Sequence, residues 1–259
     1  MNEKNPNIVI LLEEKIDINK VIDILREDWG FECKYDISEQ SQFMNYSFVY
    51  EDILFSLSEF CTKFPEDLSE DIENSCYVDE NKIEEFYEKY NNFWIVTVMK
   101  NNEEDFNKIY SLFTRVVMSM LNVSKEALVY DVRSRLVIGS EIYLQMYQHM
   151  KAAYERKQYF FPTDWYVNIQ VYQDKDGIGA VTQGFTVFND YEIEIHNKQL
   201  EYEELYKIVK YIIVNVISRQ DKISNMDTIP VPIGTSYEQA IVKQFYSEML
   251  EEEALAIIF

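Results

Sequence analysis

Glycine and proline are scarce in this sequence. Its 259 residues include only 6 Gly and 5 Pro. These two residues supply most tight turns and flexible linkers, so their scarcity argues against a long linker and against a sandwich of many short strands. It favours helices and strands joined by polar loops. Hydrophobic residues make up 47% of the chain and aromatic residues 15%, which is ample material for a large buried core.

Residues that bind metals or form disulfides are also few. The chain has three cysteines at wide spacings, Cys33, Cys61 and Cys76, and two histidines, His149 and His196. A zinc site generally needs about four such ligands at characteristic spacing, and this pattern is missing. No glycine-rich loop opens a helix, so nothing indicates a nucleotide site. We therefore expect no metal and no cofactor.

Long apolar runs are missing as well. The first six residues lack the basic and apolar regions of a signal peptide. The longest apolar runs fall well short of the roughly 20 residues that a membrane span requires. Together with cysteines that suggest reduced thiols, these features predict a cytoplasmic protein with no membrane partner.

Basic residues are outnumbered by acidic ones. The chain has 24 Lys and Arg against 46 Asp and Glu, a net charge of −22. The excess is uneven: residues 1–105 contain 26 acidic and 9 basic side chains, whereas residues 106–259 contain 20 and 15. Such a chain should repel nucleic acid and would suit a basic protein partner. An acidic surface also simply keeps a protein soluble, and this alternative stays open.

Apolar spacing predicts strands and helices mixed along the chain. The predicted strands are residues 7–12, 31–37, 46–58, 93–99, 127–132, 165–172, 180–188 and 191–195. The predicted helices are residues 17–29, 80–90, 102–122, 140–157, 201–218 and 237–253. This order indicates an α+β fold, in which one or more mixed, mainly antiparallel sheets are covered by helices, with two similar halves as one arrangement. We expect a single domain over residues 1–259, which could be subdivided into 1–101 and 102–259.

The C-terminal part gives weaker signals. Pro230 and Pro232 argue against regular structure after Ser224. Residues 255–259 read Leu-Ala-Ile-Ile-Phe, which is too apolar to be left in solvent. We expect this segment to form a strand or to pack on the core.

One group of residues suggests acid–base chemistry. Asp131 and Arg133 lie at the end of a predicted buried strand, and Glu141 and His149 lie on one face of the predicted helix that comes next. A carboxylate, an imidazole and a guanidinium near a strand end could form a general acid–base site or an anion site. The alternative is a salt-bridged surface.

Three further carboxylates alternate along a predicted strand. Asp190, Glu192 and Glu194 are separated by apolar residues, so a strand would place all three on one face. They would bind a divalent cation there, or simply face solvent opposite a buried apolar face.

The most acidic stretch runs from residue 66 to residue 88. It contains ten carboxylates and one basic residue, Lys82, and its second half has the apolar spacing of an amphipathic helix. Charged side chains next to exposed aromatic ones are typical of a protein-binding surface. The candidate partner-binding residues are Glu70, Asp71, Glu80, Glu84, Phe86 and Tyr87.

Several segments resemble a known family. Leu-Leu-Glu-Glu at 11–14, Ile-Asp at 16–17 and Trp-Gly at 29–30 are similar to the start of bacterial proteins with domain of unknown function 4261. Residues 165–171, 182–188 and 192–195 are similar to that family's central strands. The resemblance implies a bacterial, cytoplasmic α+β protein, and it implies no activity.

Three functions are consistent with the sequence. The leading one is a non-catalytic module that binds a basic protein partner, as acidic immunity proteins neutralise basic toxins such as nucleases. The second is an enzyme with its site near Asp131, Arg133, Glu141 and His149. The third is a homo-oligomer in which the apolar C-terminus pairs with a second copy.

Overall fold

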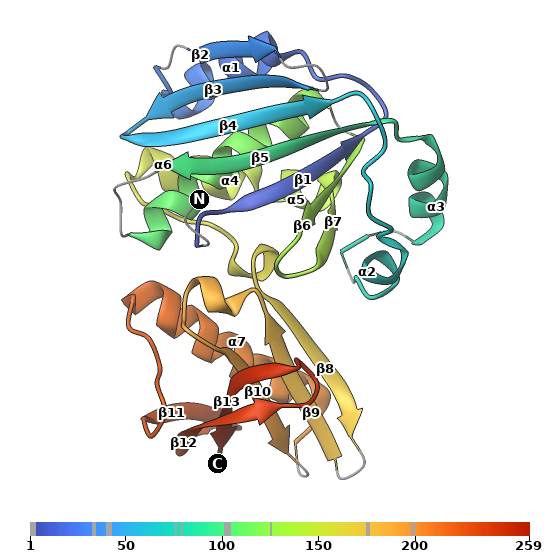
Figure 1. Cartoon of the computed structure of the whole chain (residues 1–259). Coiled ribbons are helices and arrows are strands. Elements are labelled where there is room, and N and C mark those ends of the chain that lie inside the picture. Colours follow the sequence, from blue (N-terminus) through green and yellow to red (C-terminus); the bar gives the residue numbers. More distant parts are fainter. Residues whose placement is uncertain are drawn as a thin grey trace. The chain divides into compact units, whose positions relative to one another are not determined.

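Two β-sheets organise the chain, one in unit 1 (residues 1–161) and one in unit 2 (residues 162–259) (Figure 1). The computed structural model describes residues 4–32, 35–39, 43–75, 77–78, 80–100, 105–124, 126–174, 177–197 and 200–259. About 34% of the residues are helical and about 37% lie in strands, which confirms the predicted α+β class. The boundary between the two units follows Phe161, whereas the possible subdivision predicted from the sequence follows residue 101. None of the helices in the described ranges is long and apolar enough to cross a membrane.

Unit 1 is built on a seven-stranded antiparallel sheet with the order β2-β3-β4-β5-β1-β6-β7. Its strands are β1 (Asn7–Leu12), β2 (Tyr35–Glu39), β3 (Met44–Tyr50), β4 (Ile53–Phe60), β5 (Asn92–Lys100), β6 (Ala127–Asp131) and β7 (Leu136–Gly139). The central strand β1 is apolar on both faces, and its side chains from Ile8 to Leu12 are buried. A continuous apolar run is what a strand covered on both sides requires.

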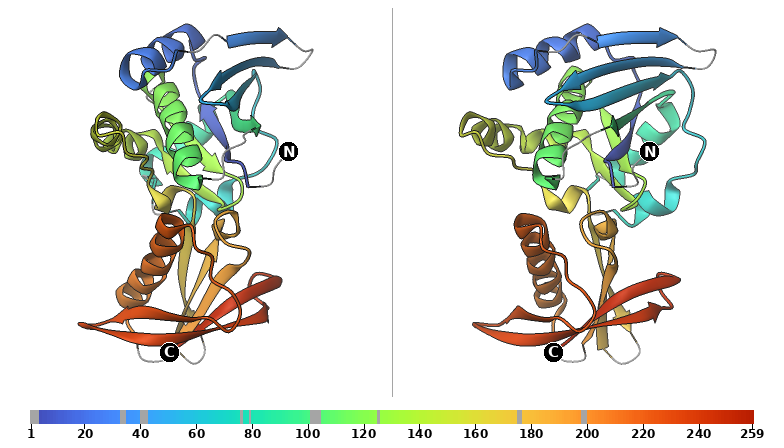
Figure 2. Two further views of the ribbon diagram at one scale, coloured as in Figure 1. Left: turned by 90° about the vertical axis from the view of Figure 1, so that its left-hand side faces the viewer. Right: turned by 60° about the vertical axis from the view of Figure 1, so that its left-hand side comes forward.

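Four helices lie on one side of this sheet (Figures 1 and 2). They are α1 (Ile18–Trp29), α4 (Phe106–Val123), α5 (Ser140–Gln145) and α6 (Tyr147–Glu155), with α6 against α1 and α5 and farther from the strands. Asp17 caps the N-terminus of α1, because its carboxylate accepts the Asn19 N–H at 3.1 Å. The helix ends at Gly30, whose φ of 65° is a left-handed conformation that glycine adopts without strain.

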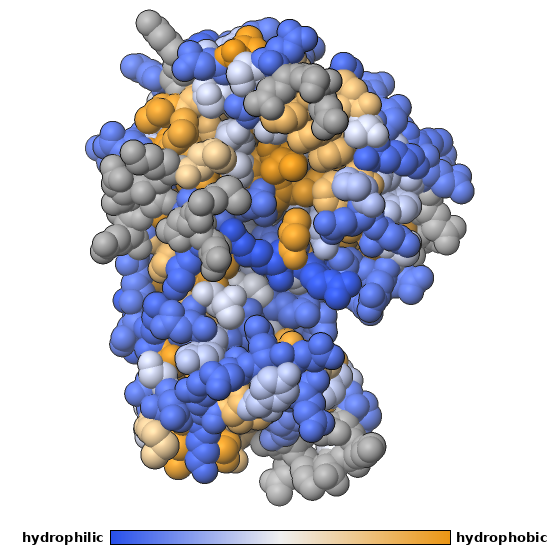
Figure 3. All heavy atoms as spheres, viewed as in Figure 1, coloured by the Kyte–Doolittle hydropathy of each residue, from blue (hydrophilic) through white to orange (hydrophobic). Residues whose placement is uncertain are grey.

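The opposite face of the sheet is covered beside β6 and β7 by two short helices, α2 (Ser69–Glu73) and α3 (Glu80–Lys89). Ile83 and Tyr90 pack there against Phe93, Leu128 and other buried side chains of the sheet. The regularly spaced apolar side chains of the acidic segment therefore anchor it to the sheet. Over the middle of this sheet, hydrophobic side chains gather at the surface (Figure 3).

Unit 2 has a six-stranded sheet with the order β11-β12-β13-β10-β9-β8, in which only β10 and β13 run parallel. Its strands are β8 (Asn168–Asp174), β9 (Gly177–Gln183), β10 (Glu192–Asn197), β11 (Thr228–Ile233), β12 (Ser236–Ser247) and β13 (Glu252–Ile258). The long helix α7 (Tyr202–Arg219) packs on this sheet, and two single 3-10 turns are η1 (Thr163–Trp165) and η2 (Phe185–Val187). The strand orders of the two sheets differ, so the units are not repeats of one arrangement.

The predicted helix over residues 237–253 is wrong. This segment forms β12, the turn after it and the start of β13. Ala240 and Val242 are buried, whereas Ile241 and Lys243 are exposed. This alternation has the period of two that is typical of a strand. Its many Glu, Gln and Lys residues are good helix formers, but pairing with two neighbouring strands overrides that preference.

Two other expectations at the C-terminus have different outcomes. Pro230 and Pro232 do not exclude regular structure, because both lie in β11, an edge strand, where a missing N–H is tolerated. Of the two alternatives for residues 255–259, the strand is confirmed for all but Phe259, since β13 ends at Ile258. β13 lies between β12 and β10, so both of its edges are paired inside the chain.

Candidate functional site

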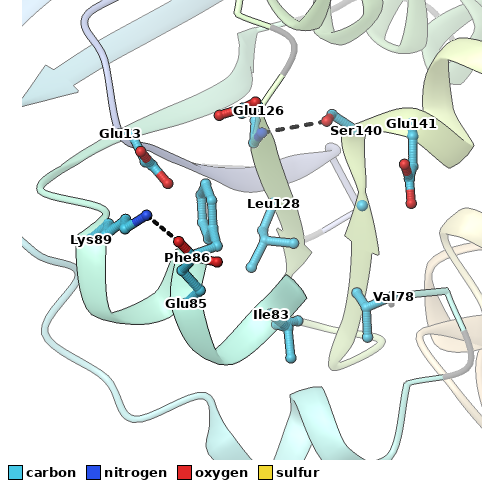
Figure 4. A pocket seen from close by; sticks show the side chains of 12 residues that line it. Glu13, Val78, Ile83, Glu85, Phe86, Lys89, Glu126, Leu128, Ser140 and Glu141 are labelled. Atoms are coloured by element: carbon cyan, nitrogen blue, oxygen red, sulfur yellow. Dashed lines mark hydrogen bonds and ion pairs between the residues drawn. The ribbon is translucent and has the colours of Figure 1, made fainter. Parts of the chain in front are cut away.

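A groove of about 490 Å³ opens in unit 1 between α3 and the β6–β7 hairpin (Figure 4). Ile83 and Phe86 come from α3, and Leu128 comes from β6. Because these side chains belong to the apolar cluster that holds α3 on the sheet, they give the groove an apolar floor. The same side chains that stabilise α3 thus shape the groove.

Four carboxylates line this groove: Glu13, Glu85, Glu126 and Glu141. Glu13 follows β1 and Glu126 precedes β6. The register of these strands places Leu12 opposite Ala127, which brings the two glutamates to the same end of the strand pair. Like charges at neighbouring positions repel, so a cation bound at this end of the sheet would relieve the repulsion between the two carboxylates.

Among the described side chains that line the groove, Lys89 alone is cationic. Its ammonium donates a hydrogen bond to Glu85, one helical turn earlier on α3 (Figure 4). This bond and the Glu85 charge raise the pKa of Lys89, and the charges of Glu13 and Glu126 raise it further. Four carboxylates against one ammonium leave a net charge of −3 around the groove.

The groove therefore suits a ligand with a positive tip and an apolar body. Its described lining contains Glu, Lys and Ser as polar residues and no His or Cys. The Ser140 hydroxyl accepts the Ala127 N–H at 3.3 Å, so it helps to join α5 to β6. The polar and apolar side chains of the groove could recognise a ligand by its charge and its shape.

The first two predicted partner-binding residues hold α2 to the sheet. Asp71 is buried, and its carboxylate accepts the Tyr130 hydroxyl at 2.8 Å and pairs with the Arg135 Nε at 2.7 Å. Glu70 is exposed, and the same guanidinium lies 3.4 Å from its carboxylate. Asp71 is thus part of the internal structure, whereas Glu70 is open to solvent on one side.

The other predicted partner residues lie on α3. Phe86 lines the groove. The Tyr87 hydroxyl instead accepts the Leu68 N–H at 3.1 Å, which joins α3 to the start of α2. Glu80 and Glu84 belong to the backbone of α3, and their side chains lie outside the described residues.

Asp131 and Arg133, which were catalytic candidates, build the turn of the β6–β7 hairpin. The buried Asp131 carboxylate accepts the backbone N–H of Arg133 at 2.9 Å and of Ser134 at 3.2 Å. Burial raises the Asp131 pKa to about 6, and the two hydrogen bonds oppose this rise. The Arg133 guanidinium donates to the Asn5 carbonyl oxygen. Both side chains therefore serve the local fold.

The structure does not bring the four catalytic candidates together. Leu128 pairs with Gly139 and Asp131 with Leu136, so these two pairs are three strand positions, or about 10 Å, apart along the hairpin. Glu141 follows Gly139 and therefore lies at the end of the hairpin away from Asp131. His149 is exposed on α6. The predicted single helix over 140–157 is divided at Met146 into α5 and α6. Of the four residues, Glu141 alone lines the groove.

The three alternating carboxylates of unit 2 also separate into different roles. Asp190 is exposed and pairs with Lys222 at 2.6 Å. Glu192 is buried, and it accepts the Thr182 hydroxyl at 2.6 Å and the first N–H groups of η2, including that of Phe185 at 3.1 Å. Burial raises the Glu192 pKa to about 6 against these hydrogen bonds. The expected solvent-facing row of carboxylates is therefore wrong.

Glu194 is buried as well, on the same strand. Its Oε1 lies 2.6 Å from His196 Nε2 and accepts the Tyr172 hydroxyl at 3.3 Å. Its Oε2 is buried and has no hydrogen-bond partner among the described residues. No group of three or more His, Cys, Asp or Glu side chains in the described part of the chain is placed to hold a metal ion.

Glu13 and Glu126 were not predicted from the sequence. Each is an acidic residue next to an apolar strand, which is an ordinary feature of a sequence. Their proximity depends on β1 pairing with β6, although these strands are more than a hundred residues apart in sequence. Strand order, which a single sequence does not reveal, was the missing information.

No protein-family model matches the chain, and comparison with curated proteins and with solved structures finds no match. The resemblance to domain of unknown function 4261 stays a prediction.

Proposed function

We propose that this protein is a non-catalytic binding protein that holds a basic protein partner at the groove of unit 1. The observation that carries this proposal is a groove with an apolar floor that is lined by four carboxylates, with one cation among the described lining residues. A basic side chain that enters the groove gains ionic contacts and buries part of its stem.

Charge supports the proposal at long range as well. The net charge of −22 attracts a basic protein before contact and increases the association rate, most strongly at low salt. At the groove, the apolar floor formed by Phe86 and Leu128 supplies the short-range contribution. Acidic proteins that neutralise basic toxins, such as nucleases, use charge complementarity of this kind, and we place this chain in that functional class.

Two triple variants with equal net charge test the proposal. The groove variant replaces Glu13, Glu126 and Glu141 with Gln. The control variant replaces three exposed glutamates elsewhere with Gln, and these are Glu27, Glu238 and Glu248. Wild type and both variants are immobilised and exposed to lysate of the source organism at about 0.05 and 0.5 M salt, and bound proteins are identified by mass spectrometry.

We expect wild type and the control variant to retain a basic protein at low salt, and the groove variant to lose it. Exposed ion pairs contribute about 0.2–1 kcal/mol each, so loss of three should weaken binding by about 3-fold to 160-fold in calorimetry with the purified partner. If all three baits retain the same proteins, the groove is not the binding site.

A further inference from the structure

We infer that Lys89 occupies the cation position of the groove in the free protein, and that the partner supplies a Lys or Arg side chain that replaces it. This inference rests on the proposed function and specifies the chemistry of the contact. Figure 4 shows the Lys89 side chain directed toward Glu85, on the same side of the groove as Glu13.

The electrostatics link Lys89 to three of the four carboxylates that line the groove. Its pKa is raised first by the hydrogen bond to Glu85, and also by the charges of Glu13 and Glu126. The ammonium thus lies in the combined field of three carboxylates, one on α3, one just after β1 and one just before β6. A ligand cation that enters the groove reaches the same field and competes with Lys89 for it.

The Lys89 side chain is held weakly enough to be displaced. It is 54% exposed, and its described ion pair is with Glu85, one turn away on the same helix. Pairs of this kind on exposed helix surfaces contribute little to stability, because water screens them and both side chains lose freedom. Moving Lys89 into solvent therefore costs little, whereas removing its charge strengthens the field on an incoming cation.

The floor of the groove selects a long side chain. Phe86, Leu128 and Ile83 are apolar, and the carboxylates stand beside them (Figure 4). Lys and Arg cover apolar surface with their methylene stems while the charged end stays with polar groups. A small inorganic cation would gain nothing from this floor, and an acidic peptide would be repelled. The guanidinium of Arg has the added capacity to bond two carboxylates at once.

The experiment uses a five-residue peptide with one arginine between two leucines, and the same peptide with norleucine in place of arginine. Each is titrated into ¹⁵N-labelled full-length protein, and NMR amide shifts at Phe86 and Leu128 give both the location and the dissociation constant. The test variant is Lys89→Gln, and Lys89→Arg is the variant that keeps the cation.

Lys207→Gln is a matched control for the change of net charge. Lys207 pairs with Glu203 at 2.9 Å on α7, with the same spacing of four residues as Lys89 and Glu85, and it is 68% exposed. Both substitutions remove one exposed helical lysine from an ion pair, but Lys207 lies in unit 2 and does not line the groove.

We expect Lys89→Gln to bind the arginine peptide about 2-fold to 5-fold more tightly than wild type, since one competing charge is removed from a partly screened site. Lys89→Arg and Lys207→Gln should keep the wild-type dissociation constant, and the norleucine peptide should show no gain. Unchanged binding in Lys89→Gln, or an equal gain in Lys207→Gln, would overturn the role of Lys89 alone. If the arginine peptide shifts no groove amide in any variant, the proposed binding site itself is overturned.

Discussion

The buried carboxyl group of Asp131 makes the stability of unit 1 depend on pH in a direction opposite to that of most acidic side chains. Burial raises its pKa from the ordinary value of 3.8 to about 6 in the folded protein. The folded state therefore binds a proton more readily than the unfolded state between these two values. Stability is greatest when the group is protonated, and it is lost as the pH rises through about 6.

The size of the effect follows from the shift. About two pKa units correspond to about 3 kcal/mol between the low-pH and high-pH limits. Between pH 7 and pH 5 the linkage relation gives a gain of about 1.3 kcal/mol in the free energy of unfolding. Asp131→Asn removes the titration while its side-chain oxygen can still accept the N–H groups of Arg133 and Ser134.

The measurement is urea unfolding at pH 5, 6 and 7, for wild type and Asp131→Asn, both with Trp165→Phe. Trp29 and Trp94 are then the remaining tryptophans, and both are fully buried in unit 1, so fluorescence reports on that unit. Wild type should gain about 1.3 kcal/mol relative to Asp131→Asn when the pH falls from 7 to 5. A difference between the two proteins that does not change with pH would refute the reasoning.

Three other predictions concern internal contacts. Glu192→Gln should remove a gain of about 1.2 kcal/mol in unit 2 between pH 7 and pH 5, because the pKa of this buried carboxyl is also raised to about 6, and hydrogen exchange along β10 measures it. Gly179→Ala should displace the Tyr172 ring, because atoms of that ring would lie 2.4–2.7 Å from the new methyl group. The free energy of unfolding in urea should fall by about 1 kcal/mol, and this loss should disappear when Tyr172→Ala is already present. Asp71→Asn should cost about 1–3 kcal/mol in thermal unfolding, since it weakens a buried carboxylate's bonds, whereas Glu70→Gln at the exposed neighbouring carboxylate should have a clearly smaller effect.

Local patterns predicted the helices well where one face is continuously apolar. The spacing of Ile18, Val21, Ile22 and Leu25 predicted α1, and these side chains are all buried. The helix prediction for residues 237–253 was wrong because this segment forms a strand only by pairing with β11 and β13. The alternation of apolar and polar residues in this segment is weak, so the sequence alone does not identify it as a strand.

The candidate site was only partly accessible to sequence reasoning. Phe86 was singled out as a candidate because the apolar residues of the acidic helix recur at helical spacing, and this side chain lines the groove. Glu141 was singled out for another chemistry, and Glu13 and Glu126 were not singled out at all. Burial of Glu192 and Glu194 was missed because period-two alternation assigns residues to faces, but does not say whether a face is covered.

The two prolines of β11 have a consequence for contacts between molecules. The Val242 N–H donates to the Asp227 carbonyl at 2.9 Å, so the alternation of an antiparallel pair directs positions 230 and 232 away from β12. Proline has no N–H to offer at either position. A foreign strand that approached this edge would find carbonyl groups without the donors that complete a ladder, so the sheet of unit 2 cannot extend in this direction by ordinary strand addition. Concentrated solutions of the protein are thereby protected at this edge from the sheet-to-sheet growth that leads to fibrils.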